Sequence, residues 1–424
     1  MNILVIGSGG REHAVIRCIS KSSKCSKIFA LPGNGGTELL AENVNGDVND
    51  FDLIKRISIK NKVSLVFVGP EDPIVNGIYD FFKSDPQLKN INIIAPSKQA
   101  SLLEGSKDFA KDFMEKYKIP TAKHKTFSEE NLYEADNFLE SMNPPYVLKA
   151  DGLAAGKGVL ILQNLNEAKA ELRSMILERK FGNSSTKVVI EEFLNGIELS
   201  CFVLTDGKNY KVLPFAKDYK KIGEGDKGLN TGGMGAISPI PFLDDNFLSK
   251  IKNKIIKPTI NGIKKENMLY NGFIFIGLIK VKDEPFVIEY NVRMGDPETE
   301  VVFPRIKNDI LELFDSMGTD KFKDIELIIN KDHAATVILV SKGYPESYEK
   351  GKIINGLNKL PKELVFHAGT IRKDNSIISS GGRVLAVTSM DKNFKLALIK
   401  SYDKIDKIKF DGMNYRRDIG FDLI

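Results

Sequence analysis

The segment VLKADGLAAGKGVLI, residues 147–161, is the most informative part of the sequence. It departs from a Walker A loop, which needs four residues between its first glycine and the Gly-Lys pair, and then Ser or Thr. Here three residues separate Gly152 from Gly156, and a further glycine follows Lys157. The apolar flanks VLK and VLI predict two antiparallel strands joined by a glycine loop. Such a hairpin, with Lys149 on one strand, can fold over a polyphosphate and neutralise its charge; a solvated glycine hairpin is the plainer alternative.

A second segment, VIEYNVRMGDPETE (287–300), places an acid and an amide on one predicted strand. Glu289 and Asn291 are two residues apart, so their side chains project from the same face. An acid and an amide oxygen suit Mg²⁺, which takes its other ligands from water and phosphate. Arg293 then points the same way, and Asp296 opens a turn at the next proline. A polar sheet face is the alternative interpretation.

The segment VVIEEFLNGIELS (188–200) puts two glutamates after an apolar strand. It is either a charged strand end or a hinge for a nucleotide base. In the second case Glu191 and the backbone up to Leu194 would meet the base, and Glu198 would accept hydrogen bonds from ribose hydroxyls.

Three glycine- or proline-rich loops follow predicted strands near the N-terminus: GSGGRE (7–12), PGNGGT (32–37) and VGPEDP (68–73). The first lacks the third glycine of a dinucleotide fingerprint, because Glu12 stands there, and no acid follows about twenty residues on. Both departures count against NAD. A glycine loop that opens a helix still offers N–H groups to an anion. In an open parallel sheet all three loops would converge on one crevice, where we expect a phosphate or phosphosugar; each alone is an ordinary turn.

Short apolar strands expected at 2–6, 27–30, 65–68 and 91–95 alternate with helices, which predicts an α/β protein with a parallel N-terminal sheet. A further hairpin is expected over 273–292. At 424 residues, about three domains are expected. We place them at 1–102, at 103–298 with a lid over about 120–190, and at 330–424, where short strands predict a small β-rich domain.

Composition excludes several classes of protein. The net charge of +5 comes from scattered lysines, which gives nucleic-acid binding little support. The three cysteines form no CxxC pair and the four histidines are far apart, so neither a disulfide framework nor a zinc site is expected. The N-terminus MNILVIGSGG lacks a basic region and a cleavage site, and no membrane span is expected. A cytoplasmic location follows.

Taken together, these segments resemble the ATP-grasp superfamily and, more closely, the phosphoribosylamine–glycine ligase family. The resemblance covers nearly the whole chain. The matching segments are IGSGGREHA, PGNGGT, VGPEDP, LEGSKDFAKDFM, KIPTA, KADGLAAGKGV, IEEFLNGIE, NTGGMGA, MGDPETE, GGRVLAV and YRRDIG. It implies a two-step ligation in purine biosynthesis: ATP phosphorylates glycine, and the amine of 5-phosphoribosylamine displaces phosphate from the glycyl phosphate. A monomer with small-molecule substrates is expected, with no nucleic-acid or membrane partner.

The resemblance also implies roles for residues at matching positions. ATP would be held by Lys107, Lys149, Gly156, Lys157, Gly158, Glu191, Glu192, Leu194 and Glu198. The phosphoribosyl group would meet Gly9, Gly10, Arg11, Glu12, Gly33, Asn34, Gly69, Pro70 and Glu71. Glu289 and Asn291 would hold Mg²⁺ or Mn²⁺, and Asp218, Arg293 and Asp296 would orient glycine.

The chain departs from the family in four places. Met294 and Glu300 stand where the family usually has phenylalanine and glutamine, and Tyr219 and Lys221 where it has histidine and arginine. The strand before Glu289 offers no further acidic metal ligand. No additional domain, such as multifunctional relatives carry, is expected.

Three other functions compete with this interpretation. A carboxylase acting on an imidazole ribonucleotide would share the phosphate and metal motifs, but the GDPET turn favours the glycine ligase. The second alternative is an NAD-dependent oxidoreductase. Glu12, which replaces the third glycine of the dinucleotide fingerprint, argues against it. The third alternative is a nucleotide-binding regulator without catalytic activity. The presence of Lys149, Glu289 and Asn291 argues against it.

Overall fold

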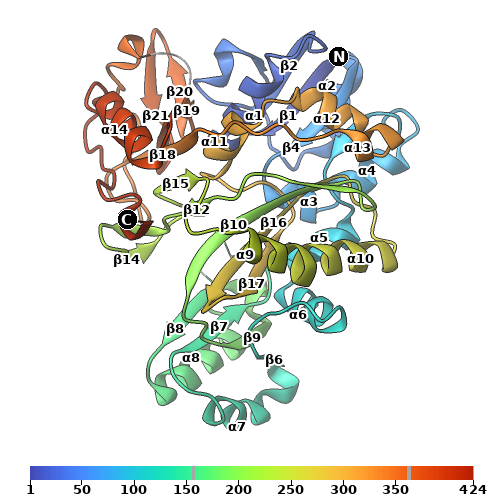
Figure 1. Ribbon diagram of the computed structural model, residues 1–424, viewed down its shortest axis with the longest axis vertical. Helices are drawn as coiled ribbons and strands as arrows, with labels where there is room; N and C mark the ends of the chain where they lie inside the picture. The colour runs from blue at the N-terminus through green and yellow to red at the C-terminus, as the bar shows by residue number, and fades with distance from the viewer. Residues whose placement is uncertain (155–157, 361–363, 424) are drawn as a thin grey trace.

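The computed structural model describes residues 1–154, 158–360 and 364–423 (Figure 1). Gly156 and Lys157, both expected to contact ATP, lie outside the described residues. Within these ranges no helix has the length and apolar character needed to cross a membrane.

The N-terminal part is a five-stranded parallel sheet in the order β3-β2-β1-β4-β5. Its strands are near-continuous apolar runs, because helices cover both faces of a parallel sheet. The predicted strands at 2–6, 27–30, 65–68 and 91–95 are confirmed as β1, β2, β4 and β5. The strands are β1 Asn2–Gly7, β2 Lys27–Pro32, β3 Glu42–Asn43, β4 Val63–Val68 and β5 Asn92–Ile94; the helices are α1 Gly10–Ile19, η1 Thr37–Leu39, α2 Phe51–Lys60, α3 Glu71–Val75, α4 Ile78–Ser84 and α5 Lys98–Gly105.

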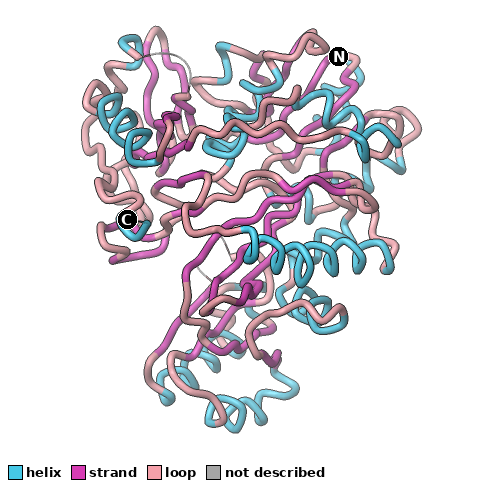
Figure 2. Tube along the Cα trace, viewed as in Figure 1, coloured by secondary structure: helices cyan, strands magenta, loops and turns pink. Residues whose placement is uncertain are grey.

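Next along the chain is a small antiparallel sheet, β6-β9-β7-β8, with two helices beyond it. Figure 2 shows these helices at one end of the molecule. The predicted hairpin is confirmed, since β7 pairs antiparallel with β8 from Tyr146↔Leu162 to Lys149↔Val159. A hydrophobic cluster of its own stabilises this unit. Its elements are β6 His124–Ser128, η2 Glu129–Glu134, α7 Ala135–Glu140, β7 Tyr146–Ala150, β8 Val159–Leu162, α8 Leu165–Leu177, η3 Gly182–Ser185 and β9 Lys187–Glu192. The preceding helix, α6 Lys107–Lys116, packs against α5 and shares the core of the N-terminal domain.

A second antiparallel sheet, β11-β10-β16-β17, lies between this unit and the N-terminal sheet (Figure 1). The hairpin expected over 273–292 is confirmed as β16 and β17, and a bulge falls between Gly277 and Leu278. One hydrophobic cluster joins this sheet to the N-terminal domain, so the two share a core. The elements are β10 Ile197–Thr205, β11 Tyr210–Val212, α9 Asp245–Ile251, η4 Lys252–Ile256, α10 Lys257–Lys265, β16 Gly272–Val281 and β17 Glu284–Asn291.

The C-terminal part is built on the sheet β12-β15-β18-β22-β19, which takes two of its strands from the middle of the chain. The chain is therefore the mixed α/β protein that its sequence predicts. Other elements here are the hairpins β13–β14 and β20–β21. Bounds are β12 Lys217–Asp218, β13 Lys221–Gly223, β14 Lys227–Asn230, β15 Gly235–Ser238, α11 Thr299–Val302, η5 Phe303–Arg305, α12 Ile310–Ser316, α13 Asp320–Asp324, β18 His333–Val340, η6 Leu357–Lys359, β19 Val365–His367, β20 Thr370–Lys373, β21 Ser376–Ser379, β22 Arg383–Asp391, α14 Phe394–Ile405 and η7 Phe421–Leu423.

Candidate active site

A cleft of about 950 Å³ lies where the three parts of the chain meet. Many residues singled out in the sequence line it: Gly9, Arg11, Glu12, Pro70, Glu71, Lys107, Gly158, Glu191, Asp218, Glu289, Asn291, Arg293 and Asp296. Segments far apart in the sequence thus supply one site. A smaller cleft of about 550 Å³ is lined by Glu192, Phe193 and Asn195 beyond the end of β9.

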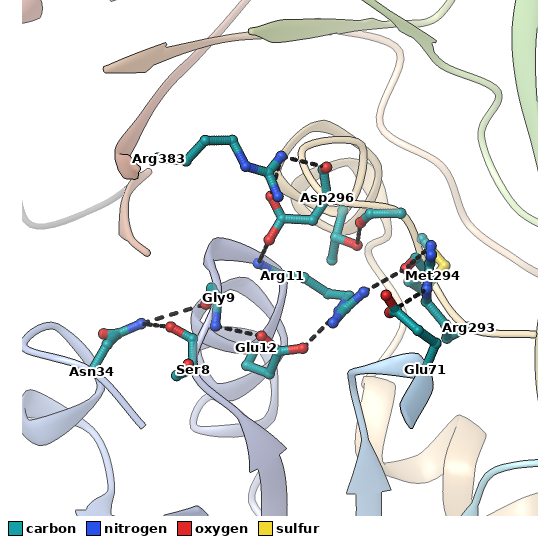
Figure 3. Close-up of polar contacts among 12 residues, drawn as sticks. Ser8, Gly9, Arg11, Glu12, Asn34, Glu71, Arg293, Met294, Asp296 and Arg383 are labelled. Atoms are coloured by element: carbon teal, nitrogen blue, oxygen red, sulfur yellow. Dashed lines mark hydrogen bonds and ion pairs between the residues drawn. The ribbon is translucent and has the colours of Figure 1, made fainter. Parts of the chain in front are cut away.

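The three N-terminal loops converge as expected: Glu12 lies between the first and third loops, and Asn34 joins the second loop to the first (Figure 3). Its carboxylate accepts a hydrogen bond from the Gly9 N–H at 2.6 Å and pairs with the Arg11 guanidinium at 2.6 Å. A Cβ atom on Gly69 would overlap the same carboxylate, so the third loop needs glycine there. The residue that breaks the dinucleotide fingerprint therefore caps the first loop from within.

Asn34, in the second loop, supports this side of the cleft from inside the protein. It is buried, and its side chain makes its hydrogen bonds to other protein groups. Its side-chain amide donates to the Ser8 carbonyl at 2.9 Å and to the His367 carbonyl at 2.7 Å. The preceding Gly33 has a left-handed φ of 71°, where glycine is favoured. The second loop thus couples the first loop to the C-terminal sheet.

Asp296 joins all three parts of the chain (Figure 3). Its Oδ2 accepts from the Arg11 N–H at 3.1 Å, and its Oδ1 pairs with Arg383 at 3.0 Å. Burial alone would raise the pKa of Asp296, but Arg383 and Arg11 outweigh it and hold the pKa below its ordinary value. Sequence reasoning missed Arg383, although it lies in the matching segment GGRVLAV.

Arg293 is fully engaged by protein groups. Its guanidinium pairs with Glu71 at 3.2 Å and Glu104 at 2.9 Å, and it donates to the Asn291 Oδ1 at 3.1 Å. The guanidinium group is planar and its N–H groups point in fixed directions, so these contacts fix the orientation of its partners. In this structure Arg293 positions Asn291.

Glu289 and Asn291 lie on β17 and face the cleft, with Gly277 opposite Glu289 on β16. The Asn291 Nδ2 is buried without a hydrogen-bond partner among the described residues. In the described part of the chain, no group of three or more His, Cys, Asp and Glu side chains could hold a metal ion. A carboxylate and an amide oxygen are ligands that a hard cation accepts.

Two lysines meet one glutamate on the opposite wall. Glu191 of β9 pairs with Lys149 of β7 and with Lys111 of α6, each at 3.0 Å. Burial lowers the pKa of Lys111 to about 8, even though Glu191 favours the charged form. Lys111 was missed from the sequence, yet it follows Lys107 by four residues and so shares a helix face with it. Lys107 itself donates to the Gly152 carbonyl at 3.3 Å.

An acidic pocket lies beside Glu289 and Asn291 in the same cleft. Lys220 links Asp218, at 3.1 Å, to Glu198, at 2.9 Å. Glu298 is buried nearby and accepts from the Ser200 hydroxyl at 3.1 Å. Burial and the negative charge of Asp218 raise the pKa of Glu298 to about 7. Sequence reasoning gave Glu298 no role; the signal was Gly295, where a Cβ atom would overlap the Glu298 carboxylate.

The end of the chain supports this acidic pocket. Tyr219, next to Asp218, donates to Asp422 at 2.8 Å. The buried Arg416 donates to the Lys221 carbonyl at 3.2 Å and pairs with Asp226 at 2.6 Å. The tyrosine side chain at 219 therefore contacts the C-terminal segment rather than the cleft, whereas at 221 the contact is made by the backbone carbonyl.

Comparisons with known proteins agree on one family. Residues 1–104, 105–299 and 334–422 match the descriptions "Phosphoribosylglycinamide synthetase" N domain, ATP-grasp (A) domain and C domain, respectively. The chain is 44% identical over 419 residues to the phosphoribosylamine–glycine ligase of Caldanaerobacter subterraneus, covering 99% of each protein. It is 41% identical over 426 residues to that of Haemophilus influenzae, covering 99% of this chain and 98% of the relative.

Solved structures show the same relationship. The crystal structure of phosphoribosylamine–glycine ligase from Thermotoga maritima superposes with a TM-score of 0.83 at 35% identity, covering 99% of this chain and all of that one. A biotin carboxylase from Campylobacter jejuni shares the fold, with a TM-score of 0.72 at 14% identity over 97% of this chain and 92% of that one.

Proposed function

The chain belongs to the phosphoribosylglycinamide synthetase family, and from that membership we propose how its cleft carries out the family's reaction. Its relatives are phosphoribosylamine–glycine ligases, so the chain is an ATP-using ligase of de novo purine biosynthesis that makes glycinamide ribonucleotide. We also propose that the protein is a monomer, that it is located in the cytoplasm and that its partners are small-molecule substrates. The matched ranges support domain limits of 1–102, 103–298 and 330–424.

The reaction proceeds in two steps. A carboxylate oxygen of glycine attacks the γ-phosphorus of ATP, and the bond to the bridging oxygen breaks, so that ADP leaves. The amine nitrogen of 5-phosphoribosylamine then attacks the acyl carbon. The acyl C–O bond breaks, phosphate leaves and the nitrogen loses one proton. No side-chain nucleophile is required, so positioning and charge neutralisation carry the catalysis.

The nucleotide lies between the small antiparallel sheet and β17. Lys107, Lys111 and Lys149 supply positive charge for its phosphates, and Glu191 holds the last two in place. Gly156, Lys157 and Gly158 are proposed from the sequence to contact ATP, and the backbone from Glu192 to Leu194, with Glu198, to contact its nucleoside. The observation that supports this placement is that Lys107, Glu191, Glu289 and Asn291 line one cleft.

A divalent cation, Mg²⁺ or Mn²⁺, fits at Glu289 and Asn291, whose paired oxygens suit a hard cation that keeps phosphate and water ligands. When bound, it neutralises the charge that develops on the transferring phosphoryl group. Arg293 serves this site by fixing the Asn291 amide.

Glycine binds in the acidic pocket, and the sugar phosphate binds at the N-terminal loops. Asp218 and Glu298 offer two carboxyl groups for the ammonium group of glycine, with Lys220 beside its carboxylate. The loops that contain Gly9 and Pro70 line the cleft and would receive the phosphoribosyl group. Asp296 keeps these two regions adjacent through Arg11.

Substrate dependence tests this function. Purified protein with ATP and a divalent cation should release ADP only when glycine and 5-phosphoribosylamine are both present, and the organic product should be glycinamide ribonucleotide. ADP release with bicarbonate in place of glycine would instead indicate a carboxylase.

A further inference from the structure

Glu300 is a buried carboxyl group without a partner. It lies in α11 with no exposed surface, and within the described ranges neither of its oxygens has a hydrogen-bond partner. Its carboxyl group lies against the first turn of α1, because a Cβ atom on Gly10 would overlap its Oε1. A desolvated, unpaired carboxylate is far more costly than a neutral polar group, so such groups usually take the neutral form.

The surrounding charges also favour the neutral form. Asp296 and Glu298 are on the same turn, and the neighbouring cation Arg383 already binds the side chain and the carbonyl of Asp296. Burial, and then the charge of Asp296, raise the pKa of Glu300 well above its ordinary value, although Arg383 opposes this. The other titratable or charged groups on the elements that pack against α11 are Arg11, Glu12, His13, Arg17 and Cys18 of α1, Arg305 of η5, His333 of β18 and Asp391 of β22.

We propose that Glu300 is a neutral carboxylic acid that acts as a positioning residue and leaves Arg383 to pair with the ionised Asp296. The neutral acid has the shape and charge of a glutamine side chain. Ionisation of Glu300 would add a second anion behind the glycine loop and compete for Arg383. If that loop receives the phosphoribosyl group, as the proposed function holds, binding of the phosphorylated ligand is linked to this proton.

The effect of pH on stability has a definite sign. An unfolded glutamate ionises near pH 4.3. Because the folded state holds the proton more tightly, the stability that Glu300 contributes is complete below that pH and falls as pH rises towards its folded pKa. Glutamine has no such loss. The variant Glu300→Gln should therefore be more stable than the wild type above about pH 5, by a margin that grows with pH until Glu300 ionises in the folded protein.

Thermal unfolding of the full chain tests the protonation state. Between about pH 5 and 9 the difference in Tm, Glu300→Gln minus wild type, should start near zero and become increasingly positive. Glu312→Gln, at an exposed position in α12, is the matched control and should show no such trend. In infrared difference spectra near neutral pH, the wild type should show a carboxylic-acid C=O band that Glu300→Gln lacks. A variant that is less stable, that fails to fold, or whose Tm difference is independent of pH overturns the proposal.

Calorimetric binding of glycinamide ribonucleotide tests the linkage to function. As pH rises, the wild type should lose affinity by up to about tenfold per pH unit, the limit for one linked proton, and take up a proton on binding. Glu300→Gln should lack the part of both effects that is linked to Glu300 and keep only the part due to the ligand's own phosphate. Equal pH dependence in the two proteins overturns the linkage. Absence of binding by both proteins at every pH contradicts the proposed phosphoribosyl site, and the Tm series still decides whether Glu300 is neutral.

Discussion

Replacing Glu298 by glutamine should remove the pH dependence of glycine binding. The pKa of Glu298 is raised to about 7 by burial and by Asp218. With that value the carboxyl group is about one-tenth ionised at pH 6 and about nine-tenths ionised at pH 8. If only the ionised form binds the ammonium group of glycine, the apparent affinity scales with this fraction, and the wild-type KM for glycine should fall about tenfold between the two pH values.

The substitution Glu298→Gln keeps the shape and can still accept the Ser200 hydrogen bond, but it carries no charge. Loss of one charge-assisted hydrogen bond costs about 1.5–3 kcal/mol, so the KM for glycine at pH 8 should rise about 10- to 150-fold. The KM for ATP should change little, because Glu298 lies in the acidic pocket and not beside the lysines.

Initial rates of ADP release, with ATP and 5-phosphoribosylamine saturating, give the KM for glycine at each pH. Glu312→Gln serves again as the control for a lost surface carboxylate. A wild-type KM that is constant from pH 6 to 8, or a Glu298→Gln profile that keeps the wild-type slope, would refute the assignment of Glu298 to glycine.

Three other predictions follow from the site. Glu289→Ala should lower turnover by about 10- to 100-fold or more with the fold intact by circular dichroism, and unchanged turnover would remove it from the metal site. Gly69→Ala should destabilise the protein by about 1–3 kcal/mol in urea unfolding, because its new methyl group meets the Glu12 carboxylate; unchanged stability would contradict this packing. Arg416→Ala should cost about 1.5–3 kcal/mol and raise the KM for glycine more than that for ATP, and an equal rise in both would exclude specific support of the acidic pocket.

Much of the fold follows from local sequence pattern. Runs such as NILVIG and VSLVFV predict buried parallel strands, and the flanks of the glycine loop predict the β7–β8 hairpin, because these signals lie within a few residues of each other. The spacing of Glu289 and Asn291 likewise places both on one face of a strand without reference to the rest of the chain.

The contacts that assemble the cleft were not predictable in this way. Asn34 reaches the His367 carbonyl, Asp296 meets Arg383, and Tyr219 meets Asp422 across long separations in sequence. Local sequence patterns do not predict contacts between residues that are so far apart in the chain. The capping role of Glu12 also depends on the third loop, whose glycine makes room for the carboxylate.

In the proposed reaction the glycine carboxylate attacks the γ-phosphate of ATP in this cleft. Glycine labelled with ¹⁸O in both carboxyl oxygens tests it most directly, with mass spectrometry of the released phosphate and of the amide product. The account predicts one labelled oxygen in the phosphate and the other in the amide carbonyl for each turnover. Release of unlabelled phosphate, with ligation still taking place, would contradict it.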